Sequence, residues 1–74
     1  MKPRKERVED IRSEIVDEYG HWPCVRNLAE YLRIDDQKVK GWMSGVPAIR
    51  DGRSIRYRAK AVAERLADME ARGV

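Results

Sequence analysis

The sequence has few of the residues from which catalytic and metal sites are built. It contains one cysteine, Cys24, and one histidine, His21, which is too few for an internal disulfide or a zinc site. It has no glycine-rich phosphate loop and no serine–histidine or cysteine–histidine arrangement beyond chance. We therefore expect no catalytic residues, no metal ligands and no cofactor, and a protein that is not an enzyme.

Long apolar runs are missing as well. No stretch is long enough to span a membrane, and no basic start is followed by the apolar segment of a signal peptide. These features, with the single cysteine, predict a cytoplasmic protein without a membrane partner. The 74 residues are expected to form one domain, 1–74, in which nearly every apolar side chain joins one core. The basic residues 1–7 are expected to be flexible.

Acidic residues are nearly absent from one part of the chain. From Gln37 to Lys60 there are seven basic residues and one acidic residue, Asp51, so this segment carries a net charge of +6. The rest of the chain carries a net charge of −3. This division predicts a defined surface that binds a polyanion.

Apolar residues recur at helical spacing in four segments, which predicts helices over 8–19, 25–33, 36–44 and 59–72. Gly20, Gly45 and Gly73 are expected to end the first, third and fourth of them. Trp22 is expected to cover the core, and Cys24 to be a small, mostly buried residue. The predicted core consists of Ile11, Ile15, Leu28, Leu32, Ile34, Val39, Trp42, Ile55, Val62 and Leu66.

The second and third predicted helices are separated by a short turn over 34–36, with Asp35 or Asp36 as the cap of the next helix. This spacing predicts a helix-turn-helix. The third helix turns Val39, Trp42 and Met43 inward, and its outer face is basic and free of acid, as the major groove of DNA requires. A surface helix whose charges are only solvated would have the same residue pattern. The neighbouring segments are therefore needed to choose between a DNA-binding helix and a solvated one.

A hairpin is predicted between the third and fourth helices. Asp51-Gly52 separates two β-prone runs, 46–50 and 53–57, and a tight turn of this kind needs a positive φ. In the second run the apolar Ile55 and Tyr57 alternate with polar and basic residues. A hairpin that only covers the core would alternate too, but it would not require arginines at its tip.

We therefore predict a mainly α fold with a small β-hairpin, a winged helix-turn-helix of four helices and a two-stranded wing. The residues predicted to bind DNA lie on the outer face of the third helix and on the wing; they are Gln37, Lys38, Lys40, Gly41, Ser44, Arg50, Arg53, Arg56 and Arg58.

Residues 25–66 resemble the excisionase-type helix-turn-helix of phages and conjugative transposons, which is similar to the DNA-binding head of MerR regulators. The segments that carry the resemblance are Leu28–Leu32, Val39 with Trp42, Gly45–Pro47 and Arg50–Tyr57. The chain departs from the pattern in its shorter 45–47 link, in its additional first helix and in Gly41, where a longer polar residue is common.

The resemblance implies that the third helix enters the major groove and that the wing contacts the minor groove or its phosphates. It also implies side-by-side binding to repeated sites and DNA bending that helps an integrase to excise a mobile element. The expected function is thus sequence-selective binding of double-stranded DNA in DNA recombination, with an integrase as a second partner. Two alternatives stay open: transcription regulation of a mobile element, which can use the same fold, and a protein-interaction module whose acidic first helix faces a partner.

Overall fold

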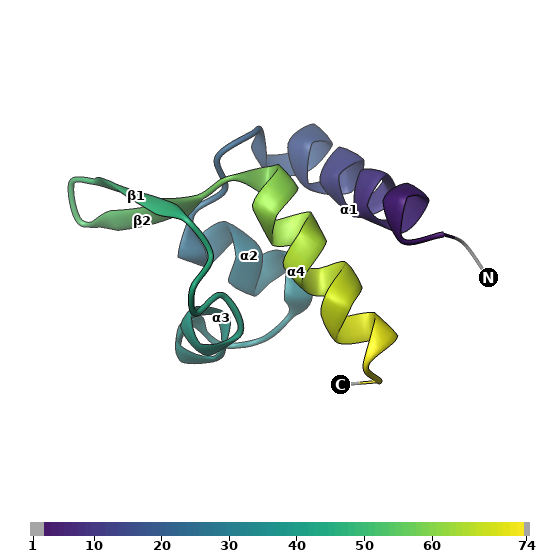
Figure 1. Cartoon of the computed structure of the whole chain (residues 1–74). Helices are drawn as coiled ribbons and strands as arrows, with labels where there is room; N and C mark the ends of the chain where they lie inside the picture. The colour runs from purple at the N-terminus through teal and green to yellow at the C-terminus, as the bar shows by residue number, and fades with distance from the viewer. Residues whose placement is uncertain (1–2, 74) are drawn as a thin grey trace.

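The computed structural model describes residues 3–73, which form four helices and one antiparallel hairpin (Figure 1). In chain order the elements are α1 (Arg4–Tyr19), α2 (Val25–Leu32), α3 (Asp36–Trp42), β1 (Ala48–Asp51), β2 (Ser54–Tyr57) and α4 (Ala59–Ala71). Figure 1 shows the hairpin projecting away from the helices, while α1 and α4 pack against each other on the other side. The predicted mainly α fold with a small hairpin is confirmed, and the arrangement is compatible with a helix-turn-helix and a wing.

A single apolar cluster joins all four helices to the second strand. Of the predicted core, Ile11, Ile15, Leu28, Val39, Val62 and Leu66 are buried, whereas Leu32, Ile34, Trp42 and Ile55 pack against the cluster and stay partly exposed. Met43, which is 1% exposed, lies deeper in the core than Trp42. Small residues of α4, Ala59, Ala63 and Ala67, are also buried. They allow the other helices to approach α4 closely.

The first helix begins at Arg4, four residues before the predicted start at Val8. The expectation that residues 1–7 are flexible stays a prediction, and residues 1 and 2 lie outside the described part of the chain. Contacts distant in sequence explain the longer helix. Arg4 Nε lies 2.8 Å from Asp68 Oδ1 on α4, and Arg7 makes two 2.7 Å hydrogen bonds to Glu70. The hydrogen bonds from these guanidinium groups lower the pKa of both carboxyls below their usual values.

The turn between α2 and α3 is short, as predicted. Arg33 ends α2 in the left-handed conformation, with φ 58°, and Asp35 caps α3 by accepting a 2.8 Å hydrogen bond from the Lys38 amide. The third helix ends at Trp42, two residues earlier than predicted. Gly45 does not end the helix itself. It has a φ of 85° in the turn that follows, where the Val46 amide donates to the Met43 carbonyl.

The hairpin turn is shifted by one residue from its predicted position. Asp51 pairs with Ser54, so Gly52 and Arg53 are the central residues of the turn, and Gly52 supplies the positive φ of 64°. A two-residue turn with glycine first is the type II′ pattern, which matches the twist of the strands. The first strand begins at Ala48, not at Val46.

The base of the hairpin is hydrogen-bonded to the loop before α2. The Tyr57 amide donates to the Pro23 carbonyl at 2.9 Å, and the Ala59 amide donates to the His21 carbonyl at 2.8 Å. Pro23 is fully buried in this loop, so Trp22 is turned outward and is 39% exposed. The prediction that Trp22 covers the core is therefore wrong. Cys24 is partly buried, and both its amide and its thiol donate to Asn27 Oδ1.

Stability should depend strongly on Leu28, at the centre of the cluster. Leu28→Ala leaves a cavity in the core cluster and is expected to lower the free energy of unfolding by about 2–5 kcal/mol. Ile49→Ala, at a position that is 48% exposed, should change it by less than about 0.5 kcal/mol. Urea unfolding followed by circular dichroism measures both. Equal effects of the two substitutions would contradict the assigned core.

Candidate nucleic-acid interface

The outward side of α3 is polar and sterically open. Gln37 and Gly41 are exposed there, opposite the buried Val39, and the exposed Lys38 lies on the flank. A Cβ atom built at Gly41 would meet no other residue within 4 Å, so nothing in the described protein covers this part of the helix. A large rigid partner can therefore come close to the backbone of α3 at this point.

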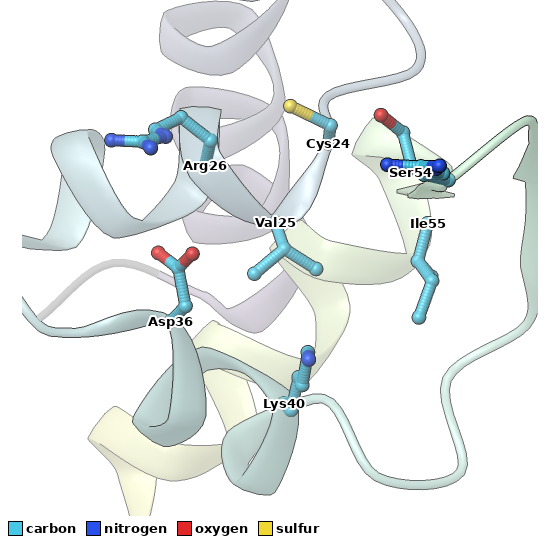
Figure 2. A pocket seen from close by; sticks show the side chains of 8 residues that line it. Cys24, Val25, Arg26, Asp36, Lys40, Ser54 and Ile55 are labelled. Carbon is cyan, nitrogen blue, oxygen red and sulfur yellow. The ribbon is translucent and has the colours of Figure 1, made fainter.

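Lys40 lies on a different side of α3. It is one helical turn after Asp36, and both residues line a hollow of about 190 Å³ between the start of α2, α3 and the tip of the hairpin (Figure 2). The residues that line this hollow are Cys24, Val25, Arg26, Asp36, Lys40, Arg53, Ser54 and Ile55. Figure 2 shows the Lys40 side chain directed towards Val25 and Ile55.

A second hollow of about 340 Å³ adjoins the first, and Lys40 and Ile55 line both. Ser44 and Arg50 also line it. Arg50 pairs with Ile55 across the hairpin, so both side chains are on the strand face that carries Tyr57. We call the two hollows together the α3–hairpin groove. Ser44 reaches this groove from the turn after α3, not from the helix as predicted.

The cations of the groove have no carboxylate partners. Lys40, Arg50 and Arg53 are exposed, and within residues 3–73 none of them forms an ion pair; the same is true of Lys38 on the flank of α3. The arginines of α1 differ, because each of them, Arg4, Arg7 and Arg12, is bound to a carboxylate. The positive charge of α3 and the hairpin is therefore available to an external anion.

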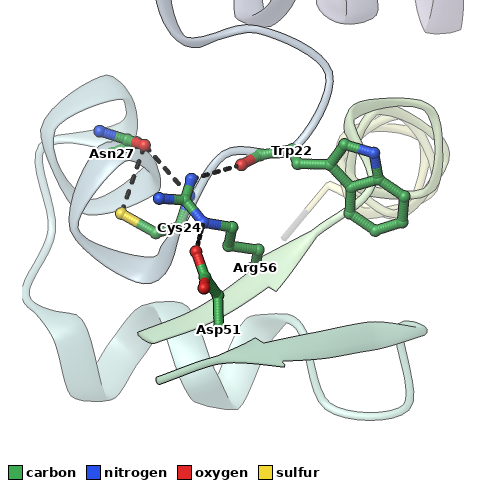
Figure 3. Close-up of polar contacts among 5 residues, drawn as sticks. All are labelled: Trp22, Cys24, Asn27, Asp51 and Arg56. Carbon is green, nitrogen blue, oxygen red and sulfur yellow. Dashed lines mark hydrogen bonds and ion pairs between the residues drawn. The ribbon is translucent and has the colours of Figure 1, made fainter. Parts of the chain in front are cut away.

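Two predicted DNA-binding arginines, Arg56 and Arg58, make contacts within the protein, and Figure 3 shows those of Arg56. Arg56 is half-buried; its Nη1 donates to the Trp22 carbonyl at 3.0 Å and its Nε to Asp51 Oδ2 at 3.2 Å. The backbone of Arg56 also forms a β-bridge with Cys24. The Arg56 side chain is on the hairpin face opposite that of Ile55. The Arg58 guanidinium lies 6.0 Å from the centre of the Trp22 ring. These contacts remove Arg56 from the predicted binding surface and direct Arg58 towards Trp22.

Arg26 is a further groove residue that was not predicted from the sequence. This exposed arginine in the first turn of α2 lines the same hollow as Lys40 and Arg53 and forms no ion pair within the described residues. A signal was present, because Arg26 is outside the apolar stripe of Val25, Leu28, Ala29 and Leu32. It was overlooked because it precedes the acid-poor segment that begins at Gln37.

Comparison of the chain with protein-family models, with curated proteins and with solved structures gave no match. Among residues 3–73, no helix has the length and apolar character needed to cross a membrane. The same residues hold no group of three or more side chains that could ligate a metal ion. The chemistry assigned to the groove therefore rests on its geometry and charge.

If Arg56 is structural, its removal should lower stability more than removal of a groove arginine. Arg56→Gln loses the hydrogen bonds to Trp22 and Asp51 and is expected to lower the free energy of unfolding by about 0.5–1.5 kcal/mol. Arg50→Gln, on the paired strand and without such bonds, should change it by less than about 0.5 kcal/mol. Urea titrations of both variants provide the measurement. If Arg56→Gln is as stable as Arg50→Gln, Arg56 does not hold the hairpin.

Proposed function

We propose that this protein binds double-stranded DNA in a sequence-selective manner without catalysing a reaction. The observation that carries the proposal is the α3–hairpin groove, where exposed cations from two elements gather without carboxylate partners. Such a surface attracts a polyanion, because every phosphate it neutralises releases condensed counterions from the DNA. The shape of the surface, a short helix beside a projecting hairpin, favours duplex DNA over a flat anionic partner.

In this proposal α3 enters the major groove with its outer side. The major groove is about 12 Å wide and admits an α-helix, whose diameter with side chains is about 10–12 Å. Gln37 is suited to an adenine edge and Lys38 to a guanine edge. Gly41 lets the helix backbone approach the bases, since no side chain projects between them.

In this proposal the hairpin contacts the DNA backbone, whereas α3 contacts the bases. Arg53 is exposed at the centre of the hairpin turn. In the proposed complex it contacts the DNA backbone or a narrow minor groove, where the negative potential is strongest. This contact positions the protein on the duplex and adds affinity for every sequence.

We further propose that the protein acts as an excisionase, a recombination directionality factor of a phage or other mobile element, together with an integrase. This finer assignment rests on the resemblance of residues 25–66 to excisionases and implies side-by-side binding at repeated sites. Transcription regulation of such an element is the alternative within the same class. Integrase-dependent excision in a reconstituted assay separates the two, because a regulator would not stimulate it.

DNA binding should weaken steeply with salt. If about five phosphates are neutralised, a plot of log K against log[salt] should have a slope of about −4.5. Fluorescence anisotropy with a labelled 20-bp duplex at increasing salt measures this slope. A nearly flat dependence, or no binding to any duplex, would favour the alternative of a protein-interaction module.

Sequence preference should depend on Gln37. Against a duplex selected from a random pool, Gln37→Ala should lose about 1–3 kcal/mol of discrimination at one or two base pairs. Arg53→Ala should weaken binding to the selected and to a scrambled duplex by the same factor, unless the site has a narrow A·T tract. Competition titrations at fixed salt compare the two variants. Loss of discrimination in Arg53→Ala alone would assign base reading to the hairpin instead of α3.

A further inference from the structure

The hollow between α2, α3 and the hairpin tip is surrounded by basic side chains from three elements. Arg26 comes from the start of α2, Lys40 from α3 and Arg53 from the turn between β1 and β2. Each is exposed, and none has an ion-pair partner among the described residues. Ser54 adds an exposed hydroxyl beside Arg53. In Figure 2 the Arg26 guanidinium points away from the hairpin, so the three residues line the hollow without meeting at one point. An anion in the hollow would attract all three cations.

We infer that this hollow is a site for one phosphate group of the DNA backbone, held jointly by Arg26, Lys40 and Arg53. The inference rests on the proposed function, because the anion is assigned to duplex DNA. Arginine donates hydrogen bonds in pairs to phosphate oxygens, and lysine adds a compact point charge. A phosphate bound here connects the helix-turn-helix to the wing, since it contacts both at once.

The size and floor of the hollow suit this ligand. Its volume of about 190 Å³ equals the space of roughly six water molecules, enough for a phosphodiester group and part of its hydration shell. Val25, which is buried, and Ile55, which is half-buried, form apolar parts of the lining. Apolar surface next to the anion weakens the screening by water and strengthens the attraction of the cations.

Asp36 is the one acidic residue among those that line the hollow, and it reduces the net charge of the lining from +3 to +2. Asp35, not Asp36, caps α3, so the helix does not need the Asp36 carboxylate as its cap. Figure 2 shows the Asp36 carboxylate at the α2 edge of the hollow, on the same side as Arg26. A bound phosphate is repelled by this carboxylate, and Asp36 thereby limits affinity for DNA of any sequence.

The same geometry assigns Lys40 to the backbone and not to a base. Lys40 and Asp36 occupy the flank of α3 that faces the hairpin, whereas Gln37 and Gly41 occupy its outer side. In the proposed complex the outer side meets the base edges, and the flank meets the phosphates beside them.

Salt titrations of charge variants on a selected and a scrambled duplex test the inference. Arg26→Gln and Lys40→Gln should each weaken binding to both duplexes by about tenfold. The triple variant of Arg26, Lys40 and Arg53 to Gln should reduce the salt slope by about one unit, because the three residues share one phosphate. Lys5→Gln is the matched control: it removes the same charge from the exposed side of α1 and should have little effect.

Four outcomes would overturn the inference. The first is that Arg26→Gln binds DNA as tightly as Lys5→Gln, and the second is that the triple variant reduces the salt slope by about three units. The third is that Lys40→Gln weakens binding to the selected duplex alone, and the fourth is that Asp36→Asn binds DNA more weakly than the unmodified protein. The expected result for Asp36→Asn is tighter binding to both duplexes. Circular dichroism confirms that each variant is folded. Failure of the unmodified protein to bind any duplex would instead contradict the proposed function, so the two failures are distinguishable.

Discussion

The hydrogen bonds between the hairpin base and the 21–24 loop fix the hairpin relative to the helices. A hairpin of two four-residue strands is at best marginally stable alone. Here the Tyr57 amide donates a hydrogen bond to the Pro23 carbonyl, and the Tyr57 side chain is buried in the core. Arg56 donates a further hydrogen bond to the Trp22 carbonyl. The loop that holds the hairpin continues directly into α2, so hairpin and helices form one frame. The hollows beside α3 depend on this attachment of the hairpin to the helices.

The sequence predicted those features that depend on neighbouring residues. Helical spacing located all four helices, and Asp-Gly located the hairpin to within one residue. The missed features depend on contacts between distant segments. Arg7 and Glu70 are 63 positions apart, so nothing local indicated that the first helix begins at Arg4. Trp22, expected to cover the core, is exposed beside the buried Pro23, whose carbonyl accepts a hydrogen bond from the distant Tyr57 amide.

Prediction of the candidate site was limited in the same way. Residue type and charge selected Lys40, Arg50 and Arg53, which line the groove, but could not separate them from Arg56, which the fold itself uses. Arg26 lies close to Arg53 only through the packing of α2 against β2, and 27 positions of sequence separate them. Charge composition thus indicated the segment that supplies most of these cations, whereas folding decides which cations line the groove. The outer side of α3, given by helical spacing alone, agreed with the structure at Gln37 and Gly41.

The open position at Gly41 has a consequence for how the surface of α3 can change. Glycine costs about 1 kcal/mol relative to alanine in a helix interior, and Gly41 is the penultimate of the seven residues of α3. A Cβ atom at this position would have open space around it, and most other residues favour a helix more than glycine does. Substitution here would therefore change the surface that α3 offers to a partner while the fold stays intact.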